Sequence, residues 1–201
     1  MLGCRGDRET VKPQNGGKTA IIGYSGSGKS TLAKYLGKKY QIPVLHLDQV
    51  HWLPGWRERE HLESAEIVGR FLDENESWVI DGNYSAMEYE RRMAEADQII
   101  FLKFNRFACL SRAFHRYFCN RGRTRKSMTE GCPEKMDLEF IWWILHEGRT
   151  GRQKKKYRAV QEKYGKKLTV IRNQGELDFM VKLYGVIERE NYNLPKSENS
   201  R

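Results

Sequence analysis

A glycine-rich segment near the start of the chain carries residues that suit phosphate binding. Residues 23–31 read GYSGSGKST and match the pattern GxxxxGK[ST] of a phosphate-binding P-loop. The glycines let successive backbone amides turn toward phosphate oxygens, and the following helix presents its positive end. Lys29 can reach the β- and γ-phosphates, and Ser30 can bind Mg²⁺, while Thr31 can bond the α-phosphate. We therefore predict that ATP binds to Gly23, Tyr24, Ser25, Gly26, Ser27, Gly28, Lys29, Ser30 and Thr31.

Two aspartates follow apolar runs further along the chain. Asp48 ends the run PVLHLD and is predicted to take the proton of a phosphate acceptor, or to hold that acceptor through a hydrogen bond. Asp81 follows WVI and is predicted to bind Mg²⁺, through water, or to orient the P-loop. Each also suits a simpler role, Asp48 as a helix cap or loop-turn residue and Asp81 as a turn residue before Gly82.

The segment after Asp48 is rich in aromatic and basic residues. It reads QVHWLPGWRERE and contains His51, Trp52, Trp56 and Arg57. The rings can clamp a planar or sugar-like acceptor, and Arg57 can meet a phosphate on that acceptor. In the alternative interpretation, the two tryptophans pack beneath the helix that follows.

These candidates need a scaffold of alternating strands and helices. Short apolar runs predict strands over 18–23, 43–48, 77–84, 98–104 and 167–172. Helical periodicity predicts helices over 28–39, 61–75, 106–119, 137–147, a basic helix ending near 163, and 176–188. This alternation predicts a parallel sheet covered on both faces, an α/β/α arrangement that binds ligands at the carboxyl ends of its strands. We expect one domain over 17–188, with a lid or insertion over about 120–157, between flexible tails at 1–16 and 189–201.

The composition narrows the classes of partner. The 201 residues carry a formal charge of +10, which favours a polyanionic partner such as a nucleotide or nucleic acid. Residues 149–167 hold nine basic residues and one acid, so the excess lies in the second half. No apolar run is long enough to cross a bilayer and no signal peptide is evident, which predicts a cytoplasmic protein without a membrane partner. The cysteines Cys4, Cys109, Cys119 and Cys132 have no metal or disulfide spacing and are interpreted as free thiols.

Other P-loop classes have signatures that this sequence lacks. Asp81 is followed by glycine rather than glutamate, and neither an NKxD nor an LSGGQ-like motif occurs, which leaves a phosphotransferase. The sequence resembles the small P-loop kinases of the adenylate-kinase-like group, and within it the DNA topology modulation (FlaR-related) proteins. The stretches that carry this resemblance are GYSGSGKSTLA, PVLHLDQVHWLPGW, WVIDGNY and RGRTRKSMTEGCPEKMDLEFIWWI. The resemblance implies a five-stranded parallel sheet in the order 2-3-1-4-5 with a helical, basic, mobile lid.

The resemblance also assigns roles to two sets of basic residues. Arg116, Arg121, Arg123 and Arg125 occupy the place of lid arginines, which stabilise the negative charge of phosphoryl transfer. Helical spacing alone adds two pairs: Arg112 and Arg116 lie one helical turn apart, and Arg149 and Arg152 lie three residues apart, so each pair is expected to point at the site from one face of its helix. Arg172 and Asn173 follow the last strand, where this group often contacts the nucleotide base. A solvated basic face and an ordinary strand-to-helix turn are the respective alternatives.

Together these features predict a kinase that uses ATP and Mg²⁺ and transfers the γ-phosphate to a small, nucleotide-like acceptor. The alternative is an ATP-dependent nucleic-acid-binding protein that modulates DNA topology, with the basic second half on the phosphate backbone. A kinase acting on polynucleotide ends lies between the two. No helix-turn-helix, zinc-finger or RNA-binding signature favours sequence-specific recognition.

Overall fold

The computed structural model describes residues 17–183, and the predicted tails, 1–16 and 189–201, lie outside this range, as does Cys4. Within it, the main sheet consists of the parallel strands β1 Lys18–Gly23, β2 Val44–His46, β5 Trp78–Asp81, β6 Gln98–Leu102 and β7 Leu168–Ile171. The strands lie in the order β2-β5-β1-β6-β7, and a separate hairpin takes the labels β3 and β4. Counted along the main sheet alone, this is the order 2-3-1-4-5.

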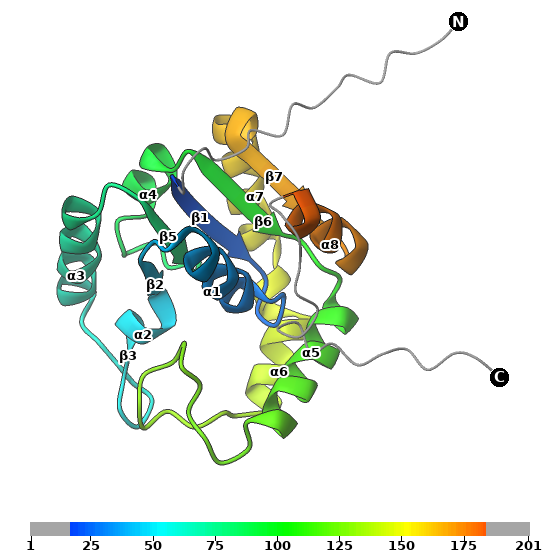
Figure 1. The fold of residues 1–201 in the computed structure, drawn as a ribbon. Coiled ribbons are helices and arrows are strands. Elements are labelled where there is room, and N and C mark those ends of the chain that lie inside the picture. The colour runs from blue at the N-terminus through cyan, green and yellow to red at the C-terminus, as the bar shows by residue number, and fades with distance from the viewer. Residues whose placement is uncertain (1–16, 184–201) are drawn as a thin grey trace, which may run out of the picture.

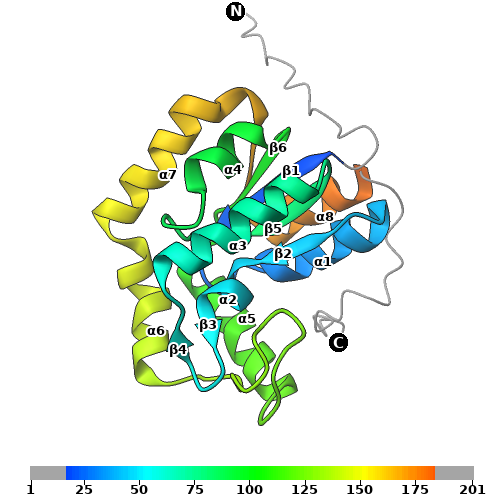
Figure 2. The ribbon, with the colours of Figure 1, turned by 90° about the vertical axis from the view of Figure 1, so that its left-hand side faces the viewer.

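Helices cover both faces of the sheet, and two of them lie beyond the carboxyl ends of its strands (Figure 1). They are α1 Lys29–Tyr40, α2 Leu47–His51, α3 His61–Glu74, α4 Tyr89–Glu95, α5 Arg106–Cys119, α6 Leu138–Leu145, α7 Gly151–Tyr164 and α8 Gln174–Leu183. Helices α1 and α8 lie on one side of the sheet, and α4 and α7 lie on the other (Figures 1 and 2). Helices α5 and α6 lie past the carboxyl ends of the strands (Figure 1). None of the helices within residues 17–183 is long and apolar enough to cross a membrane.

The core forms around the three central strands, whose side chains are buried on both faces. Ile21, Ile80 and Ile99 on β1, β5 and β6 are all fully buried. Strands this rich in isoleucine and valine are typical of a parallel sheet packed between two helical layers. The sheet is therefore a rigid base for the residues that follow each strand.

The region after β2 differs from its prediction. The strand ends at His46 rather than at residue 48, and Asp48 lies in the first turn of the short helix α2. This helix forms because Leu47 and Val50, three residues apart, are both buried. The predicted aromatic loop contains the hairpin of β3 Trp52–Leu53 and β4 Arg57–Glu58.

A further difference concerns a short, charged helix. Helix α4, with the sequence YERRMAE, was not among the predicted elements because its buried face includes Arg92, which breaks the apolar pattern. The Arg92 Nε and Nη2 donate to the carbonyl oxygens of Met87 and Tyr84, at 2.7 and 2.8 Å, while Nη1 has no hydrogen-bond partner among the described residues. The arginine-rich segment between α5 and α6 is a loop, in agreement with the gap left between the predicted helices 106–119 and 137–147. Its role as part of a lid remains a prediction. Cys109, Cys119 and Cys132 are free thiols, as predicted.

Candidate active site

The turn between β1 and α1 is built on glycines that no other residue can replace without strain. Gly26 has φ +76°, and a Cβ there would lie 2.4 Å from the carbonyl oxygen of Cys109. Gly23 has φ +147° and is equally close to the carbonyl oxygen of Leu102, at 2.5 Å. Gly28 precedes α1 and supplies no side-chain cap, so the first amides of this helix are left for an anion.

Lys29 is folded back over this turn. Its Nζ donates a hydrogen bond to the carbonyl oxygen of Tyr24, 3.1 Å away. Burial lowers the pKa of Lys29, and the carboxylates of Asp48 and Asp81 oppose this shift. The half-buried ammonium group thus lies in the field of two acids, which suits a cation that binds phosphate.

A hydroxyl and a carboxylate meet at the start of α1. Ser30 Oγ donates to Asp81 Oδ2 at 2.7 Å, and the other carboxylate oxygen of Asp81 pairs with His46 Nδ1. The sheet produces this cluster, because Asp81 on β5 lies opposite Ile21 of β1 and opposite His46 of β2. Two hard oxygen donors side by side fit the preference of Mg²⁺. The sequence prediction paired Ser30 with Asp81 but did not include His46. His46 and Asp81 lie 35 residues apart, so no pattern along the chain indicates that they meet.

Asn83 holds the glycine-rich turn from the side. Its Oδ1 accepts from the amide of Gly23 at 3.1 Å, and its Nδ2 donates to the Gly23 carbonyl oxygen at 2.5 Å. Lys156 of α7 in turn donates to the Asn83 carbonyl oxygen at 3.0 Å and to Ser85 Oγ at 2.6 Å. The sequence DGNY at the end of the third strand of the main sheet was one of the stretches that carried the family resemblance. The role of Asn83 was not predicted from it.

Aromatic rings gather around Asp48. Tyr84 Oη donates to Asp48 Oδ1 at 2.9 Å, and burial, with the nearby Asp48 carboxylate, raises the pKa of Tyr84 far above its ordinary range. The His51 ring lies 4.5 Å from that of Tyr84 and 4.6 Å from that of Trp52. Trp56 extends the group, with its ring 5.3 Å from that of Trp52. Tyr84 was missed in the sequence, because it lies 36 residues from its partner.

Arg57 lies on the hairpin next to these rings, and its side chain contacts a backbone carbonyl oxygen of the hairpin. It is exposed on β4, and its Nε is 3.5 Å from the carbonyl oxygen of Pro54. The phosphate contact assigned to it remains a prediction.

The predicted lid arginines divide into two pairs. Arg116 Nε lies 3.0 Å from Glu134 Oε2, and Arg125 pairs with the other oxygen of the same carboxylate. Burial and the charge of Arg125 lower the pKa of Arg116, while Glu134 and Asp48 oppose the shift. Arg121 and Arg123 are exposed on the loop after α5. Only the first pair is thus brought together, by a glutamate that the sequence analysis had not singled out.

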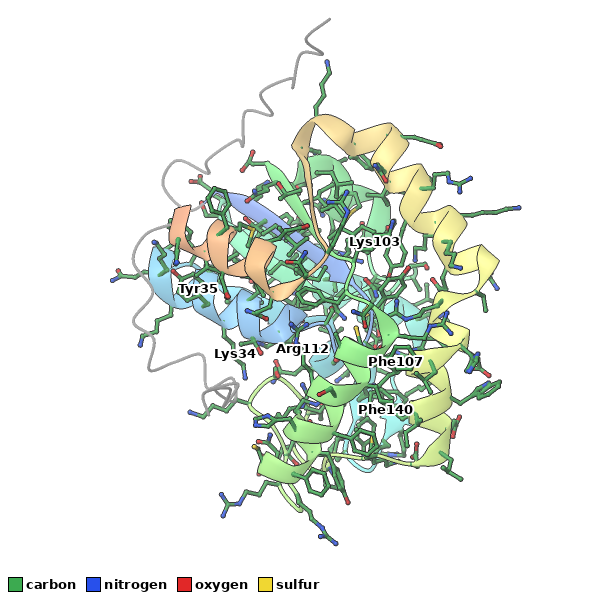
Figure 3. All side chains as sticks on the ribbon, turned by 90° about the vertical axis from the view of Figure 1, so that its right-hand side faces the viewer. Lys34, Tyr35, Lys103, Phe107, Arg112 and Phe140 are labelled. Atoms are coloured by element: carbon green, nitrogen blue, oxygen red, sulfur yellow. The ribbon has the colours of Figure 1, made fainter. Side chains whose placement is uncertain are left out.

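Arg112 and Arg149 both contact Phe104, and Arg149 also packs against Tyr24 of the phosphate-binding turn. The Arg112 guanidinium lies 3.8 Å from the Phe104 ring centre and donates to Gln174 Oε1 at 2.7 Å. Figure 3 shows Arg112 between α5 and the helices α1 and α8. Arg149 lies 3.8 Å from the Tyr24 ring centre and donates to the Phe104 carbonyl oxygen at 3.0 Å. That Arg112 acts on the site together with Arg116, and Arg149 together with Arg152, remains a prediction.

The residues after β7 have local partners. Asn173 Oδ1 accepts from the amide of Glu176 at 2.9 Å, and Glu176 Oε2 accepts from the amide of Arg172 at 2.8 Å. These bonds stabilise the start of α8, in keeping with the alternative interpretation of a strand-to-helix turn. A contact of Arg172 or Asn173 with a nucleotide base remains a prediction.

Solved structures share this architecture. The shikimate kinase from Acinetobacter baumannii in complex with shikimate is 15% identical, with a TM-score of 0.53, over 85% of this chain and 92% of that one. TT1252 from Thermus thermophilus is 16% identical, with a TM-score of 0.50, over 85% of this chain and 97% of that one. The chain has a P-loop kinase-like fold. No family model and no curated protein matches the sequence, so the resemblance to DNA topology modulation proteins remains a prediction.

Proposed function

We propose that this protein is an ATP-dependent phosphotransferase that moves the γ-phosphate to a hydroxyl group of a small, nucleotide-like acceptor. One observation carries the proposal. Asn83 bonds to Gly23 of the glycine-rich turn and its neighbour Tyr84 bonds to Asp48, so a candidate proton acceptor among aromatic rings lies close to the candidate phosphate-binding turn. The fold shared with the shikimate kinase is consistent with this chemistry.

On the donor side, each residue has a defined task. The amides at the start of α1 and the ammonium of Lys29 bind the phosphates of ATP. Ser30 and Asp81 would hold Mg²⁺, which supplies positive charge to the β- and γ-phosphates when bound. Asn83 keeps the glycine-rich turn in shape through its two bonds to Gly23.

On the acceptor side, Asp48 orients the attacking hydroxyl and takes its proton. Tyr84 occupies Oδ1 of Asp48, which leaves Oδ2 for the acceptor. The acceptor oxygen forms a bond to the γ-phosphorus as the bond from that phosphorus to the bridging oxygen of ADP breaks, and ADP leaves. His51, Trp52 and Trp56 line the acceptor. Arg116 and Arg125 contribute positive charge near the transferred group.

The contacts of the basic second half do not favour the nucleic-acid alternative. Lys163 of α7 pairs with Glu90 at 2.7 Å, and Lys167 donates to the carbonyl oxygens of Ala94 and Ala96 at 2.7 and 2.6 Å. Lys156 is committed to Asn83 and Ser85. Several cations of this segment thus serve to attach α7 and the start of β7 to the rest of the fold.

A transfer assay tests the proposal. The protein is incubated with γ-labelled ATP and Mg²⁺ against nucleosides, nucleotides, sugars and oligonucleotides, and a labelled acceptor is expected from one of the small-molecule classes. Label on oligonucleotide ends would instead identify a polynucleotide kinase. Free phosphate alone, released faster with DNA, would support the nucleic-acid alternative and refute the proposal.

Replacement of Asp48 tests its role in the same assay. Asp48→Asn is expected to lower kcat by about 10²- to 10⁴-fold, the usual contribution of a general base. ATP binding and the thermal unfolding midpoint should change little, because Asp48 is only partly buried. Glu66→Gln, an exposed acid on α3, is the matched control and should be fully active. An Asp48→Asn variant with wild-type kcat would remove Asp48 from the mechanism.

A further inference from the structure

The loop of residues 120–136, between α5 and α6, is fastened to the acceptor side of the site. Thr129 Oγ1 donates to the carbonyl oxygens of Gln49 and Trp52, at 3.0 and 2.5 Å. The amide of Gly55 donates to the Gly131 carbonyl oxygen at 3.1 Å, and Cys132 Sγ donates to the Leu53 carbonyl oxygen at 3.3 Å. Figures 1 and 2 show this loop running beside α2 and the hairpin. The loop is therefore positioned by the same elements that carry Asp48 and Trp52.

Glu134 is the acid of this loop that turns inward. Its side chain is only 5% exposed, and its carboxylate pairs with two arginines, Arg116 from α5 and Arg125 from the loop itself. A carboxylate with so little exposure is stable only where cations or hydrogen bonds replace its water. Glu134 thus ties together two basic residues that are nine positions apart in the sequence and whose like charges repel each other.

The contact with Arg116 leaves the outer part of the guanidinium free of Glu134. Arg116 donates to Glu134 through Nε, so the two terminal nitrogens of Arg116 can bind phosphate oxygens. The charge of Arg116 acts on Lys29, and that of Asp48 acts on Arg116, so the guanidinium lies near both halves of the site. A carboxylate that competed with phosphate would instead be expected on the terminal nitrogens.

We infer that Glu134 is a positioning residue, which orients Arg116, with Arg125 beside it, toward the phosphoryl group in transfer. This inference rests on the proposed function. Because the loop is fastened to α2 and the hairpin, Glu134 also links the placement of Arg116 to the elements that bind the acceptor. The GCPE sequence then has a specific purpose: Cys132 anchors the loop and Glu134, two residues later, orients the arginine.

Steady-state kinetics of Glu134→Gln test the inference. This variant keeps the size of the side chain but loses its charge and one of its two acceptor oxygens, so Arg116 and Arg125 can no longer both be held. We expect kcat to fall by on the order of a hundredfold, the effect of a displacement of about 1 Å at a catalytic group. The KM values for ATP and for the acceptor should change little, since Lys29 and the aromatic residues are untouched. Glu130→Gln, an exposed acid in the same loop, is the matched control and should match the wild type.

Two further variants separate positioning from a purely structural role. Arg116→Ala should lower kcat at least as much as Glu134→Gln, and adding Glu134→Gln to Arg116→Ala should cause little further loss, because the two residues act as one unit. Glu134→Asp keeps the charge and should recover part of kcat. If Glu134→Gln does not fold, Glu134→Asp and Arg116→Ala still decide the matter: Arg116→Ala with wild-type kcat overturns the inference.

The outcomes distinguish this inference from the proposed function. If the wild type is active and folded Glu134→Gln has the same kcat or a higher one, the positioning role is overturned and the proposed function stands. Additive losses in the double variant also overturn it. A wild type that phosphorylates no acceptor refutes the proposed function, and the role of Glu134 with it.

Discussion

Replacing Lys29 with methionine should separate the stability of the protein from its binding of ATP. Lys29 has a lowered pKa because partial burial desolvates it, so the folded state disfavours its charged form. Below that pKa, the charge therefore reduces the free energy of unfolding, and an apolar side chain of similar length removes the penalty. Without ATP, Lys29→Met should unfold at the same temperature as the wild type or at a higher one.

With MgATP present, the same variant should lose about half or more of the stabilisation by ligand. At a concentration of about 100 Kd, binding stabilises the wild type by about 2.7 kcal/mol. For a chain of this size, that raises Tm by about 5–11 °C. Loss of a hydrogen bond from a charged donor costs about 1.5–3 kcal/mol, which weakens binding by about 10- to 150-fold. At the same ATP concentration, about 0.3–1.4 kcal/mol of stabilisation then remains.

Differential scanning fluorimetry with and without MgATP measures both effects. Lys38→Met is the control, since Lys38 is an exposed lysine in the last turn of the same helix. That variant should keep the full shift with ATP. The reasoning is refuted if Lys29→Met retains the wild-type shift, or if it unfolds well below both other proteins in the absence of ATP.

Two other substitutions test the glycine-rich turn and α4. Gly26→Ala should destabilise the fold by on the order of 1–3 kcal/mol and abolish ATP binding. Gly69→Ala, in an open position on α3, should instead stabilise the fold by up to about 1 kcal/mol. Chemical denaturation compares the two variants, and equal stability would contradict the strain argument. Tyr89→Phe should stabilise the protein by up to about 1–3 kcal/mol, because the Tyr89 hydroxyl is buried without a hydrogen-bond partner among the described residues. Burial raises the pKa of Tyr89 from 10.0 to about 12, so wild-type stability falls as pH rises from about 10 to 12. The advantage of Tyr89→Phe should widen over that interval in unfolding curves, and a constant difference would contradict this account.

The sequence could predict those features that depend on neighbours along the chain. The strand, the turn and the start of α1 follow from contiguous residues, and the strand ends bring Ser30 and Asp81 together once the sheet is parallel. The pairing of Arg116 with Glu134 depends instead on how a long loop packs against the hairpin, and no periodicity encodes that packing. Asp48 was likewise predicted at a strand end, because the apolar run continues to Leu47. A helix begins there instead, since tertiary packing buries Leu47 and Val50 on one helical face.

The contact between α6 and the phosphate-binding turn has a practical consequence. Trp143 Nε1 donates to Ser25 Oγ at 3.2 Å, and the indole is 40% exposed. An indole bonded to the predicted ATP-binding turn is an intrinsic optical reporter, whose emission responds to the polarity and hydrogen bonding around its ring. Nucleotide titrations can therefore be followed in the unlabelled protein, with Trp143→Phe to assign the signal, before any acceptor is known.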